Sequence, residues 1–449
     1  MTAGTLNASL ASVELASRSF ARIGADLAPG AWPRLVRACE EGRARLEGRT
    51  LWSISSTALG GGVAEMQRTL SPYWRAAGID ARWLVLTGTE DYFRFTKRLH
   101  NLLHGRAVRR PGLDDRALFD RVGRAAATEA ASLVARGDVV VLQDPQTAAL
   151  VAPLRRTGAR VVWRCHVGAD TASGAVEAAW RFLLPYIEEA DTFVFTRRAV
   201  APDVLPADRV MLVSPAIDPR SEKNRPLMPG GARALLDRWG LAPAGPEDRL
   251  VLALARWDRL KDPIGILQAF ARHVEDPRAF LVLAGPEVGV VADDPEAARV
   301  LTEVNLAWHR LAPPRRERVQ IAALPMADLE ANALIVNALQ REASIVVKKS
   351  LQEGFGLGVT EGMWKAKPVV ATRVGGHQDQ IEHRRSGLLV DDPADLPAFA
   401  SAIDELLADP LLGRELGAAG RERVRARYLA DRHFVSWMEV LRRLPDRAP

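Results

Sequence analysis

The sequence predicts two α/β domains, each built as a doubly wound parallel sheet covered by helices. The chain has 449 residues, which exceeds what one hydrophobic core usually supports. Short apolar strand patterns alternate with amphipathic helical patterns along most of its length, as in a parallel sheet. Two of the expected strand-to-helix turns are rich in glycine, at residues 60–62 and 354–358, which is typical of turns that approach a ligand closely.

The first domain is expected over residues 50–218. Apolar strand patterns lie at residues 50–56, 82–86, 139–142, 160–165 and 192–195, separated by helical patterns such as those at residues 63–77, 115–135 and 146–156. Residues 1–49 carry no chemical motif, and we expect them to form a helical extension that packs on this domain.

The second domain is expected over residues 219–425, where a polar stretch with prolines gives way to a new series of strands. Its strand patterns lie at residues 250–255, 280–284, 319–322, 343–347, 368–372 and 387–390. Helical patterns at residues 396–407 and about 417–444 close the chain, and we expect residues 426–449 to pack back on the first domain. Since ligands bind beyond the carboxyl ends of such strands, the two domains are expected to face a central cleft.

The composition is that of a soluble globular protein. Apolar residues make up 48% of the chain and charged residues 26%, which is ordinary usage. There is no run of about 18 uncharged apolar residues and no basic start followed by an apolar segment, so we expect a cytoplasmic protein without a membrane span. Two cysteines, Cys39 and Cys165, are too few for a disulfide framework.

The charge pattern argues against a nucleic-acid-binding protein. The 61 basic and 55 acidic side chains are interspersed along helices, and the net charge is +6. Metal-binding patterns are missing as well, because the sequence has no Asp-x-Asp pair, no His-Glu-x-x-His and no Cys-x-x-Cys. We therefore expect no bound metal and no cofactor.

The segment from Lys348 to Trp364 is the most informative one, because it holds two glutamates around a glycine-rich turn. Glu353 is expected on the loop after a strand, and Glu361 inside the helix that follows. The first amides of that helix have no partner within it and suit a phosphate or a sugar oxygen. Four of the seven lysines in the chain flank the pair: Lys348, Lys349, Lys365 and Lys367. An ordinary glycine-rich turn with solvated charges is the alternative.

Three further residues are expected at carboxyl ends of strands. Arg256 and Lys261 follow the strand pattern at residues 250–255, where two cations could hold a diphosphate and stabilise its charge as it leaves. The alternative is a surface loop in which Arg256 pairs with Asp258. His166 closes the strand pattern at residues 160–165 and is either a site residue or a packed structural one.

With these pieces in place, the chain resembles the retaining glycosyltransferases of the GT-B fold, in which two Rossmann-like domains bind a nucleotide sugar. The two glutamates, Arg256 and Lys261 match that family's motifs. The resemblance implies that Glu353 and the amides of the adjoining turn hold the donor sugar, that Glu361 holds the ribose, and that Arg256 and Lys261 grip the diphosphate. The residues of that turn are Gly354, Phe355, Gly356 and Leu357.

Within the family, several stretches of the first domain look like trehalose synthases of the glycosyltransferring type: residues 55–66, 78–83, 96–101 and 162–166. The resemblance implies transfer of glucose from a nucleoside-diphosphate glucose to glucose, reversibly, giving α,α-trehalose by front-side attack. His166 would contact the donor sugar, and Gly61 and Gly62 would close over donor and acceptor. Lys97 and Asn101 are acceptor-side candidates or, equally, helix-surface residues.

One departure concerns the acceptor. Related synthases usually show Asp or a similar polar residue soon after the cleft histidine, where this chain has Val167, Gly168 and Ala169 before Asp170. The acceptor contacts are therefore less well defined than the donor contacts.

Other functions stay open at this point. A trehalose phosphorylase, or a related transferase with another acceptor, would use a similar architecture. A nicotinamide-dependent oxidoreductase would need Gly-x-Gly-x-x-Gly after a strand, and the loop at residues 60–62 lacks that spacing. The expected partners are a nucleotide sugar and a small sugar acceptor, with no nucleic acid; the oligomeric state is open, a homodimer among the options.

Overall fold

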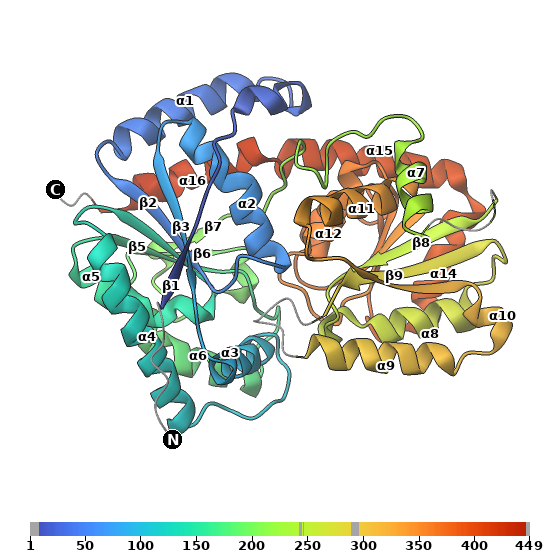
Figure 1. The fold of residues 1–449 in the computed structure, drawn as a ribbon, viewed down its shortest axis with the longest axis horizontal. Coiled ribbons are helices and arrows are strands. Elements are labelled where there is room, and N and C mark those ends of the chain that lie inside the picture. The colour runs from blue at the N-terminus through green and yellow to red at the C-terminus, as the bar shows by residue number, and fades with distance from the viewer. Residues whose placement is uncertain (1–8, 242–244, 246, 289–295, 446–449) are drawn as a thin grey trace. The chain divides into compact units, whose positions relative to one another are not determined.

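The computed structural model describes residues 9–241, 245, 247–288 and 296–445, and these residues form two compact units. Among them, residues 9–215 and 430–445 make up the first unit, and residues 216–288 and 296–429 make up the second. Each unit is a sheet covered by helices on both faces (Figure 1). The prediction of two doubly wound α/β domains is confirmed.

The first unit holds a seven-stranded sheet in the order β1-β3-β2-β4-β5-β6-β7. All neighbouring strands run parallel except β1, which is antiparallel to β3. The strands are β1 Leu10–Val13, β2 Thr50–Ser55, β3 Asp80–Leu86, β4 Val139–Gln143, β5 Arg160–Cys165, β6 Thr192–Phe195 and β7 Val210–Leu212.

Helices cover both faces of this sheet. A large apolar core lies between the strands and α3, α4 and α6, and Figure 1 shows α1, α2 and α16 on the other side. The helices are α1 Ala31–Arg45, α2 Gly61–Ala76, α3 Glu90–Leu103, α4 Leu113–Leu133, α5 Val151–Arg156, α6 Gly174–Ile187 and α16 Ala430–Arg443.

The expectation of a purely helical segment at residues 1–49 is wrong at β1. Leu10 pairs with Leu86 at the edge of the sheet, and the amides of Ser9 and Leu10 donate to Glu129 on α4, at 2.6 and 3.0 Å. The strand therefore forms because residues far along the chain supply hydrogen-bond partners for its backbone, and an exposed sheet edge offers such partners. Local sequence preference does not reveal these partners.

The second unit holds a six-stranded parallel sheet in the order β10-β9-β8-β11-β12-β13. This is the strand order 3-2-1-4-5-6 of nucleotide-binding doubly wound domains. The strands are β8 Arg249–Leu254, β9 Ala279–Pro286, β10 Val319–Leu324, β11 Ile345–Lys348, β12 Val369–Thr372 and β13 Leu388–Val390.

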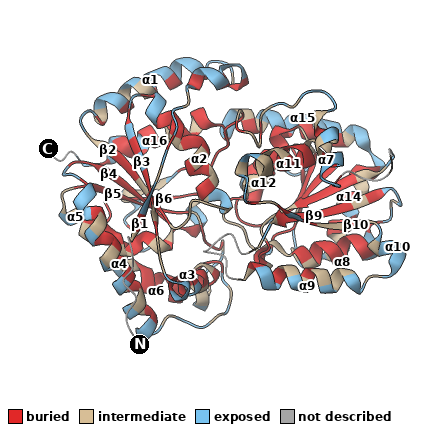
Figure 2. Cartoon of the chain, in the orientation of Figure 1, coloured by how far each residue is buried: buried red, intermediate tan, exposed pale blue. Residues whose placement is uncertain are grey.

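Two apolar cores sandwich this sheet. One lies under α7, α11, α12 and α15, and the other under α8, α9 and α14. Figure 2 shows the strands almost wholly buried and the outer helix faces exposed. The helices are α7 Gly231–Arg238, α8 Pro263–His273, α9 Ala297–His309, α10 Pro313–Arg316, α11 Leu329–Glu342, α12 Leu357–Trp364, α13 His377–Gln380, α14 Leu396–Ala408 and α15 Pro410–Arg427. Across the ranges that the structure describes, no helix combines the length and apolarity needed to cross a membrane.

The expected helix at residues 417–444 is in fact two helices. Between α15 and α16 the chain leaves the helical path, and the Ile217 amide donates to the Tyr428 carbonyl at 2.9 Å beside a bridge between Ile217 and Leu429. After this break α16 belongs to the first unit and packs along α1, where Arg442 Nε donates to Glu41 Oε1 at 2.6 Å.

In both sheets the strand order reverses next to a central strand. The reversal lies between β2 and β4 in the first unit and between β8 and β11 in the second. Loops that leave neighbouring strands in opposite directions at such a point open a crevice for ligands. The loops that hold Arg256, Lys261 and Glu353 leave β8 and β11 at the second reversal.

We predict that Gly417→Ala destabilises the protein by about 1–3 kcal/mol, because a methyl group there would collide with the Ala366 carbonyl oxygen, where α15 crosses the end of α12. Alanine in a helix otherwise stabilises by up to about 1 kcal/mol relative to glycine. Gly413→Ala on the same helix is the matched control, because its methyl group would lie 3.6 Å from Pro368 Cγ, in ordinary contact. Urea unfolding of both variants measures the difference, and equal stability would contradict the close approach.

Candidate functional site

The reversal in the second sheet brings Lys261 and Glu353 together. Lys261 lies on a short 3-10 helix after β8, and Glu353 lies on the loop after β11. Lys261 Nζ donates to Glu353 Oε2 at 2.6 Å, and Ser350 Oγ donates to the same oxygen at 3.2 Å. The side chains keep 22% and 12% of their exposure. A cation and a carboxylate therefore meet at the point where a doubly wound domain binds its ligand.

Backbone and charge contacts hold the two loops in register. The Leu351 amide donates to the Leu260 carbonyl at 2.8 Å. Lys349, only 1% exposed, pairs with Asp262, whose carboxylate also caps α8 by accepting from the Gly265 amide at 3.0 Å. Lys349 is thus a structural cation that joins the loops rather than a surface charge.

Arg256 lies between the end of β8 and the short helix that carries Lys261. Its Nη2 is 3.8 Å from Asp258 Oδ2, and Asp258 is 1% exposed and accepts from the Leu260 amide at 2.8 Å. The ion pair considered as the alternative for Arg256 therefore exists. It links Arg256 to the base of the loop that carries Lys261.

The glycine-rich turn after Glu353 is closely covered by another loop. Gly356 has φ +86° and caps α12, while Phe355 is buried. A methyl group at Gly375 would overlap the Glu353 carbonyl, and one at Gly376 would meet the Phe355 backbone. The turn can take its position only because Gly375 and Gly376 have no side chains.

The sequence interpretation missed His377, which follows these two glycines. The ring is 0% exposed, Nδ1 lies 3.1 Å from the Thr372 carbonyl oxygen, and Nε2 lies 3.7 Å from Glu353 Oε2. Because a carbonyl can only accept, Nδ1 carries the proton and Nε2 a lone pair. Burial lowers the pKa of His377 to about 4, against the opposing effect of Glu353. The signal in the sequence was Gly-Gly-His after an apolar strand.

Glu361 lies inside α12, as predicted, and is 4% exposed. Gln340 Nε2 donates to its Oε2 at 2.9 Å, and Lys223 Nζ lies 3.5 Å from Oε1. Burial alone would raise the pKa of Glu361, but Lys223, Lys365 and Gln340 together lower it, so the group is a carboxylate at neutral pH. Neither Lys223 nor Gln340 carried a sequence signal.

Lys348 ends β11 beneath this turn. It donates to the Leu254 carbonyl, and a methyl group at Gly358 would collide with its ammonium group. Burial lowers the pKa of Lys348 to about 8, while Glu361 and Glu353 pull it upward. Lys348 therefore links the two glutamates electrostatically at the amino end of α12.

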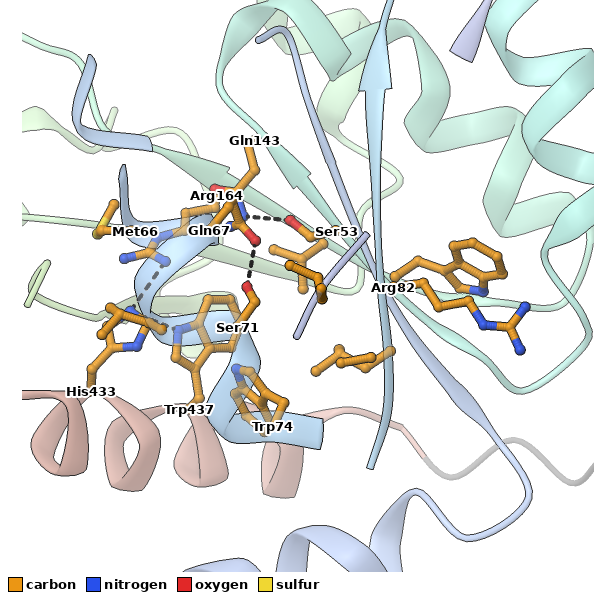
Figure 3. Close-up of a pocket in the computed structure, with 16 residues that line it drawn as sticks. Ser53, Met66, Gln67, Ser71, Trp74, Arg82, Gln143, Arg164, His433 and Trp437 are labelled. Atoms are coloured by element: carbon orange, nitrogen blue, oxygen red, sulfur yellow. Dashed lines mark hydrogen bonds between the residues drawn. The ribbon is translucent and has the colours of Figure 1, made fainter. Parts of the chain in front are cut away.

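In the first unit, His166 directly follows β5, at the carboxyl end of the strand. Its backbone amide donates to Asp144 Oδ1 at 2.7 Å, and its Nε2 lies 3.1 Å from Gln143 Oε1. The Gln143 amide nitrogen donates to Ser53 Oγ at 3.2 Å (Figure 3), so its oxygen faces His166 and accepts from Nε2. Burial lowers the pKa of His166 well below its ordinary value, and Arg164 and His433 act in the same direction.

The other candidates of the first unit lie on α2 and α3. Gly61 and Gly62 begin α2, are exposed, and Gly61 has φ +75°. Lys97 and Asn101 on α3 are 8% and 5% exposed, so the helix-surface alternative for them is wrong. Asn101 Oδ1 is buried without a hydrogen-bond partner among the described residues.

In the second unit, four charged or polar side chains gather around one turn: Lys261, Glu353, His377 and Lys348. Arg256 is linked to this turn through Asp258, and Glu361 acts electrostatically on Lys348. Paired cations and carboxylates at a helix amino terminus can bind an anion and hydroxyl groups side by side. Within the described ranges, no three His, Cys, Asp or Glu side chains lie close enough to hold a metal ion.

Two family models match the chain. "Trehalose synthase, N-terminal domain" matches residues 53–202, and "Glycosyl transferases group 1" matches residues 330–423. The trehalose synthase of Rubrobacter xylanophilus is 36% identical over 392 residues, covering 86% of this chain and 89% of the relative. The trehalose phosphorylase of Grifola frondosa is 26% identical over 440 residues, covering 91% of this chain and 59% of the relative.

The fold has a solved counterpart. The UDP-forming α,α-trehalose-phosphate synthase of Burkholderia xenovorans, solved with glucose-6-phosphate, has a TM-score of 0.71 at 16% identity, over 88% of this chain and all of that one. Together with the two Rossmann-like units, this likeness shows the GT-B fold. From the family models and the identity across most of both chains, we conclude that this chain belongs to the trehalose synthase family of glycosyltransferases.

Proposed function

We propose that this glycosyltransferase moves glucose from a nucleoside-diphosphate glucose to glucose, reversibly and with retention, to form α,α-trehalose. The observation that carries the proposal is the 2.6 Å contact between Lys261 and Glu353 at the reversal of the second sheet. It supports a site that holds a leaving diphosphate and a sugar next to each other.

On the donor side, each group has a separate task in the proposal. Lys261 and Arg256 hold the diphosphate, and their fixed charge stabilises the charge that develops when the glycosidic bond breaks. Glu353 and the amides from Gly354 to Leu357 hold the hydroxyls of the glucose. Glu361, kept ionised by its neighbours, holds the ribose.

The first unit supplies one contact to the donor sugar and the groups on the acceptor side. His166 is held by Gln143 with its Nδ1 left to accept a hydrogen bond from a hydroxyl of the donor sugar. The loop with Gly61 and Gly62 closes over the substrates, and Lys97 and Asn101 are the acceptor-side candidates, since the buried Asn101 oxygen lacks a partner in the described part of the chain. The acceptor hydroxyl attacks on the face that the diphosphate leaves, and the phosphate takes its proton.

The proposal predicts that Lys261→Ala and Glu353→Ala each lower the rate of glucose transfer at least about 100-fold, because each removes a fixed charge from the reacting donor. Product analysis with several nucleotide-glucose donors and free sugars measures the rate, and NMR of the anomeric linkages reports retention. Arg259→Ala is the control, since Arg259 lies on the same short helix but pairs with Glu303. Full activity of both variants would refute the site.

The direction of the reaction separates the synthase from its alternative, a trehalose phosphorylase, which the likeness to the Grifola frondosa enzyme favours as second candidate. We expect trehalose with a nucleoside diphosphate to give nucleotide-glucose, and trehalose with inorganic phosphate to give no glucose 1-phosphate. Chromatography of both reactions detects the sugar phosphates. Glucose 1-phosphate from the phosphate reaction alone would establish the phosphorylase instead.

The neutral state of His377 has a consequence for stability. Its folded pKa of about 4 lies below its ordinary value of 6.5, so the unfolded chain binds the proton more readily and acid favours unfolding. The part of the free energy of unfolding that depends on neutral His377 is fully present above pH 6.5 and is lost as the pH falls towards 4. This part amounts to about 3 kcal/mol. The free energy of unfolding of His377→Asn should fall less steeply over this range in urea titrations. His273→Asn, at an exposed position on α8, is the control; identical slopes for all three proteins would contradict the assignment.

A further inference from the structure

The first unit contains a cavity that the proposed reaction does not use. It has a volume of about 40 Å³ and lies between the sheet and helices α2 and α16 (Figure 3). One water molecule needs roughly 10–15 Å³ of such space, so the cavity has room for an occupant larger than a single water. Its polar lining consists of Ser53, Gln67, Ser71, Gln143, Arg164 and His433, with Arg82 at another part of the wall.

Arg164 is the only one of these six groups with a permanent charge. It is 2% exposed, and among the described residues no carboxylate lies within ion-pair distance of it. Burial lowers the pKa of Arg164 to about 9, against the effect of the Asp144 carboxylate, so the guanidinium is charged at neutral pH. A buried charge without a close counter-charge costs several kcal/mol.

The contacts that Arg164 does make are weak. Nη1 lies 3.4 Å from His433 Nε2, Nη2 lies 3.4 Å from the Val213 carbonyl, and the guanidinium lies 5.2 Å from the centre of the Trp437 ring. Nε is buried and has no partner in the part of the chain that the structure describes. His433 Nε2 also accepts from Trp437 Nε1 at 3.1 Å, so one lone pair is shared between two donors.

The rest of the polar lining offers hydrogen-bond donors, and both of its amide oxygens already accept a hydrogen bond. The Gln67 oxygen accepts from Ser71 at 2.8 Å, and the Gln143 oxygen faces His166. Ser53 Oγ accepts from Gln143, which leaves the Ser53 proton available, and no described residue accepts from the Gln67 amide nitrogen. A cavity with a cation and spare hydrogen-bond donors matches the chemistry of an anion.

We propose that this cavity binds a small monovalent anion, such as a halide, between Arg164 and the side chains of Ser53 and Gln67. The anion supplies a counter-charge in direct contact with Arg164, which the Asp144 carboxylate does not. Gln143 connects the cavity to His166, so an occupied cavity also fixes the amide that orients His166. The inference concerns the first unit alone and does not depend on the donor or acceptor of the reaction.

Bromide tests the proposal directly. Crystals grown with sodium bromide should give an anomalous peak within hydrogen-bond distance of the Arg164 guanidinium. In solution, the melting temperature should rise with the logarithm of bromide or chloride concentration when gluconate keeps the ionic strength constant, because an anion that binds only the folded state stabilises it. Water alone in the cavity together with a melting temperature that halides leave unchanged would overturn the proposal.

Variants identify the site. Arg164→Met keeps a long side chain but removes its charge. It should abolish both the anomalous peak and the dependence of the melting temperature on halide. Arg160→Met is the matched control, since Arg160 is buried on the same strand but donates to the Gly137 carbonyl away from the cavity. If Arg164→Met does not fold, Gln67→Met is the deciding variant, because it keeps the Arg164 cation. It should weaken the dependence of the melting temperature on halide concentration. An unchanged dependence would place the halide elsewhere.

Discussion

The parallel pairing of β8 with β11 is the constraint on which the rest of the second unit depends. Ile345, Val346 and Val347 pair with Val251, Leu252 and Ala253, so both strands end at the same edge of the sheet. Their following loops leave towards opposite sides because the strand order reverses there. The 2.6 Å approach of Lys261 to Glu353 is a consequence of this register, since a slip of one residue would turn the alternating side chains of one strand to the other face.

Burying charges at that edge is costly, and the unit offsets the cost with opposite charges. Lys349 pairs with Asp262, Lys261 with Glu353, and Glu361 with Lys223. Each pair joins segments far apart in sequence, so the pairs also fix the loops relative to the sheet. In the first unit, the direct contacts of Arg164 are with neutral groups, and the Asp144 carboxylate acts on it only electrostatically. That contrast is why a counter-ion is expected in one unit and not in the other.

Patterns that repeat along the chain could be predicted from the sequence, and contacts between distant residues could not. The strands at Arg160–Cys165 and Thr192–Phe195 were located to the residue, and Glu353 and Glu361 fell on the loop and the helix as predicted. β1 was missed because its partners are Leu86 and Glu129, far along the chain. Arg164 was overlooked because one polar residue in a strand looks like an outward-facing position, whereas here the sheet is covered on both faces.

His166, directly after β5, and His377, at the start of α13, point to the kind of chemistry that the sites can perform. Gln143 fixes the proton of His166 on Nε2, and the Thr372 carbonyl fixes that of His377 on Nδ1, so each ring keeps one lone pair. Burial lowers the pKa of both rings, that of His377 to about 4. A general base works best with a pKa near the working pH, so both rings are better suited to accept hydrogen bonds than to take up protons. A reaction in which the leaving phosphate takes the proton of the acceptor needs no stronger base from the protein, and this is the reaction that we propose.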